Sequence, residues 1–131
     1  MTNPGFARKF YQNLGKLFYA VAASDKAVKI EEIKALKSIV EKEWVSIDEY
    51  QDEFGTDTAH QIEIIFDWLE ENQPDAFLAF KEFSDFKKEH ENLFNNKINK
   101  LILKTADAIA DSFGGKNKSE LIMLSKLKSI I

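Results

Sequence analysis

The chain of 131 residues contains no cysteine. A disulfide framework, a metal site with thiolate ligands and a cysteine nucleophile are therefore excluded. No apolar run approaches the roughly 20 residues of a membrane span, and the start MTNPGFARKF lacks the apolar core of a signal peptide. We therefore expect a cytoplasmic protein without membrane insertion.

Positive charge is absent from the middle of the chain. Residues 43–75 contain 11 Asp and Glu and no Lys or Arg, whereas residues 1–42 carry 8 basic against 4 acidic side chains and residues 76–131 carry 10 against 7. Nucleic-acid binding depends on clustered Lys and Arg, so we expect no nucleic-acid partner. Two interpretations of the acidic segment 43–75 stay open. It complements the basic flanks of its own chain, or it binds a basic protein partner or a cation.

Apolar residues recur every three or four positions along most of the chain, which is the spacing of one helical face. This pattern predicts helices from Phe6 to Ala23, through Ile33 to about Asp48, from Thr58 through Leu69, after Pro74, up to Gly114 and after Asn117. No stretch alternates convincingly with period two, so strands are not expected. The predicted fold class is all-α, with one domain over residues 1–131.

Several residues mark where these helices begin and what they bury. Thr58 with Gln61, and Asn117 with Glu120, have the spacing of a capping box. Pro74 suits the first turn of its helix, where a missing N–H is harmless. Aromatic residues at helical spacing are usually core residues, and the last helix is apolar on much of its circumference. We therefore expect the last helix and the following aromatic residues to be buried: Trp44, Trp68, Phe77, Phe80, Phe83 and Phe86.

A pattern occurs twice in the sequence, as AVAASDKAVKIEEIKAL and as ADAIADSFGGKNKSELIML. Each copy has an Ala-rich helix end, an Asp, a short linker and a Glu that opens an apolar helix. The first helix pair should pack as a hairpin, because its linker is short. We expect two hairpins related by a pseudo-twofold, at about 6–48 and 97–131, with a central acidic helical insertion at about 57–92.

This doubled pattern resembles the TerB-like family of tellurite-resistance proteins. In that family the linker usually reads Asp-Gly followed by an acidic residue, whereas here Lys26 and Ala27 follow Asp25, and Ser112 and Phe113 follow Asp111. The resemblance implies a non-enzymatic helical module connected with tellurite or metal stress. It also implies that acidic positions at the hairpin turns are divalent-ion ligands.

The candidate metal ligands are the paired carboxylates Asp25, Glu32, Asp111 and Glu120. Carboxylate oxygens favour magnesium, calcium or manganese, and a pseudo-twofold would bring both pairs together. The alternative is capping, because a Glu in a first helical turn favours the positive end of the helix dipole. Lys26, next to Asp25, would then supply the positive charge without any metal.

Catalytic constellations are missing from the sequence. A di-metal site of the ferritin type needs Glu-x-x-His motifs, but Asp57 and Lys87 stand three residues before His60 and His90. We expect both histidines at the surface, and no nucleophile elbow or phosphate loop is present. Two hypotheses follow: a non-enzymatic TerB-like module that binds a divalent cation or a protein partner, and an adaptor whose acidic segment binds a basic protein.

Overall fold

The computed structural model describes residues 4–47 and 58–131, and all regular structure in these ranges is helical. The all-α fold class is thus confirmed. No helix among the described residues is long and apolar enough to cross a membrane. The helices are α1 (Pro4–Ala22), α2 (Ile30–Ile39), α3 (Val45–Ile47), α4 (Gln61–Asn72), α5 (Ala76–Glu89), α6 (Asn96–Asp111) and α7 (Lys118–Ile130).

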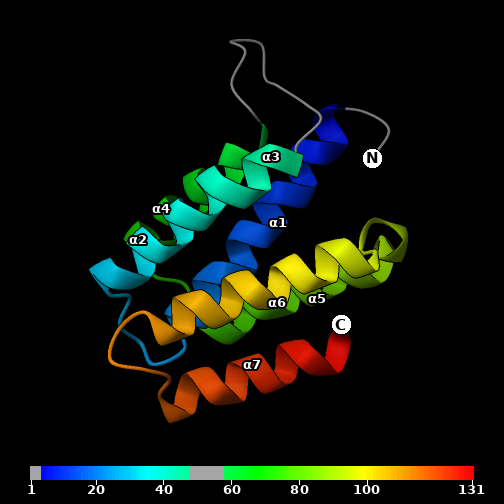
Figure 1. Cartoon of the computed structure of the whole chain (residues 1–131). Coiled ribbons are helices and arrows are strands. Elements are labelled where there is room, and N and C mark those ends of the chain that lie inside the picture. The colour runs from blue at the N-terminus through cyan, green and yellow to red at the C-terminus, as the bar shows by residue number, and fades with distance from the viewer. Residues whose placement is uncertain (1–3, 48–57) are drawn as a thin grey trace.

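Helix α1 is the centre of the fold (Figure 1). It packs most extensively against α4 and α5, and also against α6 and α7, so almost its whole length is buried. Helix α2 packs mainly on α6. The predicted first hairpin is therefore wrong in its packing, because α1 and α2 are joined by a short turn but each finds its main partner elsewhere.

Gly15 allows the close approach of α1 and α4. A Cβ atom at this position would lie 2.8 Å from the carbonyl oxygen of Ile62 and 3.0 Å from Cβ of Ile65. Backbone atoms cannot yield at such distances without moving the helix. The segment predicted as an insertion, 57–92, thus supplies the two helices, α4 and α5, that cover α1 most fully.

Helix α2 continues into a turn of π-helix over Val40–Trp44 before α3 begins. Trp44 at the end of this turn is fully buried, and its Nε1 donates a hydrogen bond of 3.0 Å to Oγ1 of Thr105 on α6. The indole is therefore buried without leaving its N–H group unpaired. The predicted second helix is confirmed as far as Ile47, whereas its expected end at Asp48 lies outside the described residues.

Two predicted helix starts differ from the structure. Thr58 is buried in a 3₁₀ turn, Thr58–His60, and α4 begins after His60 without a side-chain cap. Pro74 lies before α5, not in its first turn, because Asp75 is the N-cap and accepts hydrogen bonds from the N–H groups of Phe77 and Leu78. By contrast, the predicted capping box of Asn117 and Glu120 is confirmed at the start of α7.

Several residues expected in the core are exposed. Trp68 on α4 is 58% exposed and Phe77 on α5 is 50% exposed, whereas Trp44, Phe83 and Phe86 are buried. Helix α7 buries only one side, since Leu121 and Ile122 face solvent. A helix at the edge of the molecule needs one apolar stripe, so its remaining apolar residues have no core to enter.

Candidate functional site at the two linkers

The two helix connections that the repeat predicts share a serine hydrogen bond and one positive-φ position. The first linker is residues 23–29, between α1 and α2, and the second linker is residues 112–117, between α6 and α7. The Ser24 hydroxyl donates to the Val21 carbonyl at 2.9 Å, and the Ser112 hydroxyl donates to the Ile109 carbonyl at 2.7 Å. Two positions later, each linker adopts a positive φ.

That positive φ falls on Lys26 in the first linker, at 70°, and on Gly114 in the second, at 65°. Corresponding residues are separated by 88 positions throughout, as Ser24 is from Ser112 and Glu32 is from Glu120. Asp25 therefore corresponds to Phe113. The predicted pairing of Asp25 with Asp111 is wrong by two residues, because the Asp residues were aligned by type and not by backbone conformation.

Glu32 and Glu120 close equivalent caps. Oε1 of Glu32 accepts the N–H of Lys29 at 2.8 Å, and Oε1 of Glu120 accepts the N–H of Asn117 at 3.0 Å. The Lys29 side chain is an ammonium and cannot accept a hydrogen bond. At the first cap the Glu32 N–H therefore donates to the backbone carbonyl of Lys29, at 3.0 Å. The capping role predicted as the alternative to metal binding is thus present at both glutamates.

The same two glutamates meet inside the molecule. Glu32 is 0% and Glu120 is 3% exposed, and the Glu120 carboxyl lies close enough to act on that of Glu32. Burial raises the pKa of Glu32 to about 8, and the neighbouring Glu120 carboxyl acts in the same direction. Oε2 of Glu32 is buried and has no hydrogen-bond donor unless a proton lies between the two carboxyl groups. A proton shared between the two carboxyl groups would account for both observations, and we state it as a hypothesis that the titration of Glu32 tests.

Asp25 connects the two linkers. Its Oδ2 accepts from Nζ of Lys29 and from Nδ2 of Asn117, both at 2.7 Å, and its Oδ1 accepts the N–H of Ala27 at 3.1 Å. Burial alone would raise the pKa of Asp25, but the bonds from Lys29 and Ala27 lower it overall. The Lys29 Nζ also lies 5.5 Å from the centre of the Phe113 ring.

Lys29, not Lys26, is thus the cation of the site. Its pKa is raised, first by the hydrogen bond to Asp25 and also by the charges of Glu32 and Glu120. Lys26 is exposed at the surface of the first linker. We define the linker cluster as Asp25, Lys29, Glu32, Asn117 and Glu120, in which an ammonium occupies the position that a cation would take among the carboxylates.

Asp111 lies apart from this cluster. It is exposed at the end of α6, where its Oδ1 is 3.6 Å from Nζ of Lys116, which also pairs with Asp107 at 3.1 Å. The structure therefore brings together three of the four predicted ligands. In the two described ranges, no group of three or more His, Asp or Glu side chains is arranged to hold a metal ion.

The histidines stand elsewhere and are not simply surface residues. His90 is half-buried and packs against the rings of Phe6 and Phe86, with centroids 4.8 and 4.5 Å away. His60, also half-buried, lies 3.7 Å from Glu63. Neither belongs to the linker cluster.

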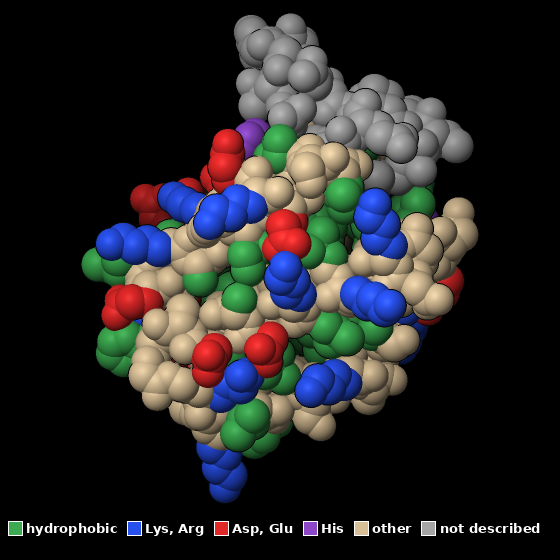
Figure 2. Space-filling model, in the orientation of Figure 1, with side chains coloured by type: hydrophobic (Ala, Val, Ile, Leu, Met, Phe, Trp, Pro, Cys, Tyr) green, Lys and Arg blue, Asp and Glu red, His purple; other side chains and the backbone are tan. Residues whose placement is uncertain are grey.

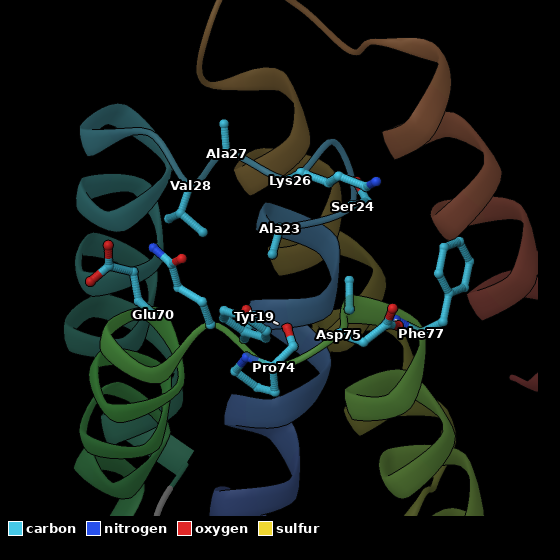
Figure 3. Close-up of a pocket in the computed structure, with 12 residues that line it drawn as sticks. Tyr19, Ala23, Ser24, Lys26, Ala27, Val28, Glu70, Pro74, Asp75 and Phe77 are labelled. Atoms are coloured by element: carbon cyan, nitrogen blue, oxygen red, sulfur yellow. Dashed lines mark hydrogen bonds between the residues drawn. The ribbon is translucent and has the colours of Figure 1, made fainter.

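A pocket that sequence reasoning missed lies on the other side of the first linker (Figure 3). Its volume is about 580 Å³, and it lies between the first linker and the connection from α4 to α5. The Tyr19 hydroxyl, on α1, donates to the Pro74 carbonyl at 2.7 Å and ties the two walls together. No local sequence signal marks the pocket, because its residues come from segments some 50 positions apart.

Comparison with known proteins finds no matching family model, no similar curated protein and no similar solved structure. The resemblance of the doubled linker pattern to the TerB-like family therefore stays a prediction.

Proposed function

We propose that this chain is a non-enzymatic binding module whose helix α4 docks a basic, partly apolar segment of another protein. The observation that carries this proposal is the exposure of two large apolar side chains on α4. Ile64 is 55% and Trp68 is 58% exposed, one helical turn apart. They face away from the buried stripe of Ile62, Phe66 and Leu69. Exposed tryptophan is the side chain most enriched at the energetic centres of protein interfaces.

The charges around these two residues favour a basic partner. The described part of the acidic segment after Thr58 carries five carboxylates and no Lys or Arg: Glu63, Asp67, Glu70, Glu71 and Asp75. Asp67 and Glu71 are exposed and lie on the same outward face as Trp68. We call Ile64, Asp67, Trp68 and Glu71 the α4 face.

Part of the acidic segment is paired within the chain, as the first interpretation of its charge predicts. Glu43 lies 2.8 Å from Lys104, and Asp67 lies 3.4 Å from Lys37. Lys37 and Asp67 are both about half exposed, so their pair contributes little and can be exchanged for a partner. On the face that carries α6, by contrast, lysines are interspersed with acidic side chains (Figure 2).

A helical peptide made only of leucine and lysine, with the leucines on one side of its helix, tests the α4 face. Trp44 is fully buried, so a change in tryptophan fluorescence on titration reports Trp68. We expect saturable binding that weakens with ionic strength. Calorimetric titration, which does not depend on tryptophan, should show that the affinity falls about tenfold or more in Trp68→Ala. The equally exposed Leu78→Ala on α5 is the matched control. Equal affinity for wild type, Trp68→Ala and Glu71→Gln would overturn the proposal.

A second candidate function is divalent-cation binding at the linker cluster. Two observations support it: the carboxyl groups of Asp25, Glu32 and Glu120 belong to one cluster, and Lys26 takes the positive φ that suits the glycine of the TerB-like linker. The connection with tellurite or metal stress rests on that resemblance. The lack of cysteine supports a cytoplasmic location for the same module.

Thermal unfolding with calcium, magnesium or manganese tests the cation version. We expect an ion-dependent rise in the melting temperature that disappears in Asp25→Asn combined with Glu32→Gln. Asp111→Asn is the control, because Asp111 lies outside the cluster. No shift with any of the three ions in the unmutated protein would remove this candidate.

A further inference from the structure

The pocket between the first linker and the α4–α5 connection has the electrostatic character of a cation site. Helix α1 ends at Ala22 and α4 ends at Asn72, and the residues that follow each end, Ala23 and Gln73, line the pocket. The C-terminal ends of two helices, which carry partial negative charge, therefore lie beside it. Two carboxylates, Glu70 and Asp75, also line it.

The negative charge at the pocket acts on the hydroxyl group of Tyr19. The pKa of its hydroxyl is raised, chiefly by burial and then by the charges of Glu70 and Asp75. Both carboxylates thus act on one atom at the inner wall of the pocket. They come from opposite sides of the α4–α5 connection, with Pro74 between them (Figure 3).

The remaining wall is mostly apolar. Ala23, Val28, Pro74 and Ala76 contribute small aliphatic surfaces, and the ring of Phe77 closes one side (Figure 3). A charged group on a short chain of methylenes suits such a wall, because the stem buries apolar surface while the charge reaches the carboxylates.

One like charge lies at the rim. The Lys26 side chain runs along the rim away from Glu70, toward the side of Phe77 (Figure 3). Lys126 lies 5.7 Å from the centre of the Phe77 ring. Glu70 lies on the α4 side of the pocket, whereas Asp75 and the two lysines lie toward Phe77 (Figure 3). A positive group that enters from α4 therefore meets Glu70 first.

We propose that this pocket receives the ammonium or guanidinium group of a lysine or arginine side chain from the segment docked on the α4 face. The inference rests on the proposed docking function and adds a specificity site to it. Glu70 of the pocket is on the same helix as Trp68, and Gln73 directly follows the end of that helix. At about 1.5 Å per residue, the distance from Ile64 to Asn72 along the helix is about 12 Å. A short segment of a partner spans that distance.

Capped single amino acids test the pocket without touching the α4 face. N-acetyl-arginine amide and N-acetyl-lysine amide are titrated into the full chain, and N-acetyl-citrulline amide serves as the neutral counterpart of the arginine probe. Binding is followed by NMR at the backbone amides of Ala27, Val28, Gln73 and Phe77. We expect saturable shifts with the cationic probes and none with citrulline. Equal shifts with citrulline and arginine would overturn the proposal.

Substitutions assign the effect to residues. Glu70→Gln combined with Asp75→Asn keeps the shape of the pocket and a good N-cap for α5, and it should weaken binding about tenfold or more. Glu71→Gln removes the same charge outside the pocket and should leave the affinity unchanged. Lys26→Gln should tighten binding, because it removes the like charge at the rim. Unchanged affinity in the Glu70→Gln and Asp75→Asn variant would also overturn the proposal.

The two proposals fail in different ways. Trp68→Ala should leave the binding of the single amino acids unchanged, because their contacts are in the pocket. If the leucine-lysine peptide binds through Trp68 but the cationic probes do not bind, the pocket inference is wrong and the docking face stands. If the probes bind and the peptide does not, the docking face is wrong and the pocket remains a site for basic groups.

Discussion

The first and second linkers share their hydrogen bonds and one positive-φ position but differ in side chains and at Gly115, where the second takes a further positive φ of 86°. In both, a serine hydroxyl donates to the carbonyl three residues earlier, and the residue two positions after the serine has a positive φ. Both end in a helix cap that a buried glutamate closes. Yet the first has Asp25, Lys26 and Lys29 where the second has Phe113, Gly114 and Asn117. The comparison teaches that backbone hydrogen bonds and the two glutamates define the motif, while the side chains between them set its charge.

Replacing the two N-cap residues should give the largest difference between the linkers. Lys29→Met removes the cation that neutralises Asp25 beside two buried glutamates, and we expect a loss of about 2 kcal/mol or more in the free energy of unfolding. Asn117→Ala removes a cap and one hydrogen bond to Asp25, at a cost of about 1 kcal/mol. Urea unfolding of both variants measures the difference. Equal losses would mean that the charge of Lys29 contributes nothing to the cluster.

The next effect concerns pH. The pKa of Glu32 is raised from 4.5 to about 8 in the folded state, so the stability contributed by its proton is fully present below about pH 4.5 and is lost as the pH rises through 8. The free energy of unfolding of the wild type should therefore fall across this range, by up to about 1.4 kcal/mol per pH unit.

Glu32→Gln should remove that fall. Its amide oxygen can still accept the N–H of Lys29, and its NH₂ group can donate permanently to Glu120. At pH 8 we expect the variant to melt above the wild type, and at pH 5 close to it. Glu31→Gln, an exposed neighbour on α2, is the control and should keep the slope of the wild type. A variant that loses the same stability at every pH would contradict the shared proton.

The smallest effects come from the positive φ position. Lys26→Gly should stabilise the protein by about 0.5 to 1 kcal/mol, because a side chain at φ 70° is strained. Gly114→Ala should destabilise it by a similar amount through backbone strain alone, since no atom lies within 4 Å of the added Cβ. Thermal melts of the two single variants test this pair. Changes of the same sign would show that the linkers are not equivalent at this position.

The sequence was sufficient for features that depend on neighbouring residues. The helical periodicity predicts α1 and α6 nearly to their ends, and the spacing of Asn117 and Glu120 predicts their cap. Such features involve hydrogen bonds and apolar stripes within one turn or a few turns, so the chain alone determines them.

Features that depend on packing between distant helices were missed. Trp68 fits an apolar pattern, but the main contacts of α4 are with α1 on its buried side, and Trp68 on the outward side is 58% exposed. The meeting of Glu32 with Glu120 was expected only through the assumed pseudo-twofold of the repeat, because it depends on the position of α7, which no local pattern encodes. Asp111 was assigned to the site because it is acidic and ends an Ala-rich helix. By backbone conformation, however, the residue that corresponds to Asp25 is Phe113.

The titration of Glu32 tests the shared proton most directly. The ¹³Cδ chemical shift of Glu32, followed by NMR from acid to alkaline pH, should show a titration midpoint near pH 8. In Glu120→Gln, with Asp25 and Lys29 in place, this midpoint should move toward the ordinary glutamate range. A midpoint near 4.5 in the wild type would contradict the shared proton, because Glu32 would then be ionised at neutral pH.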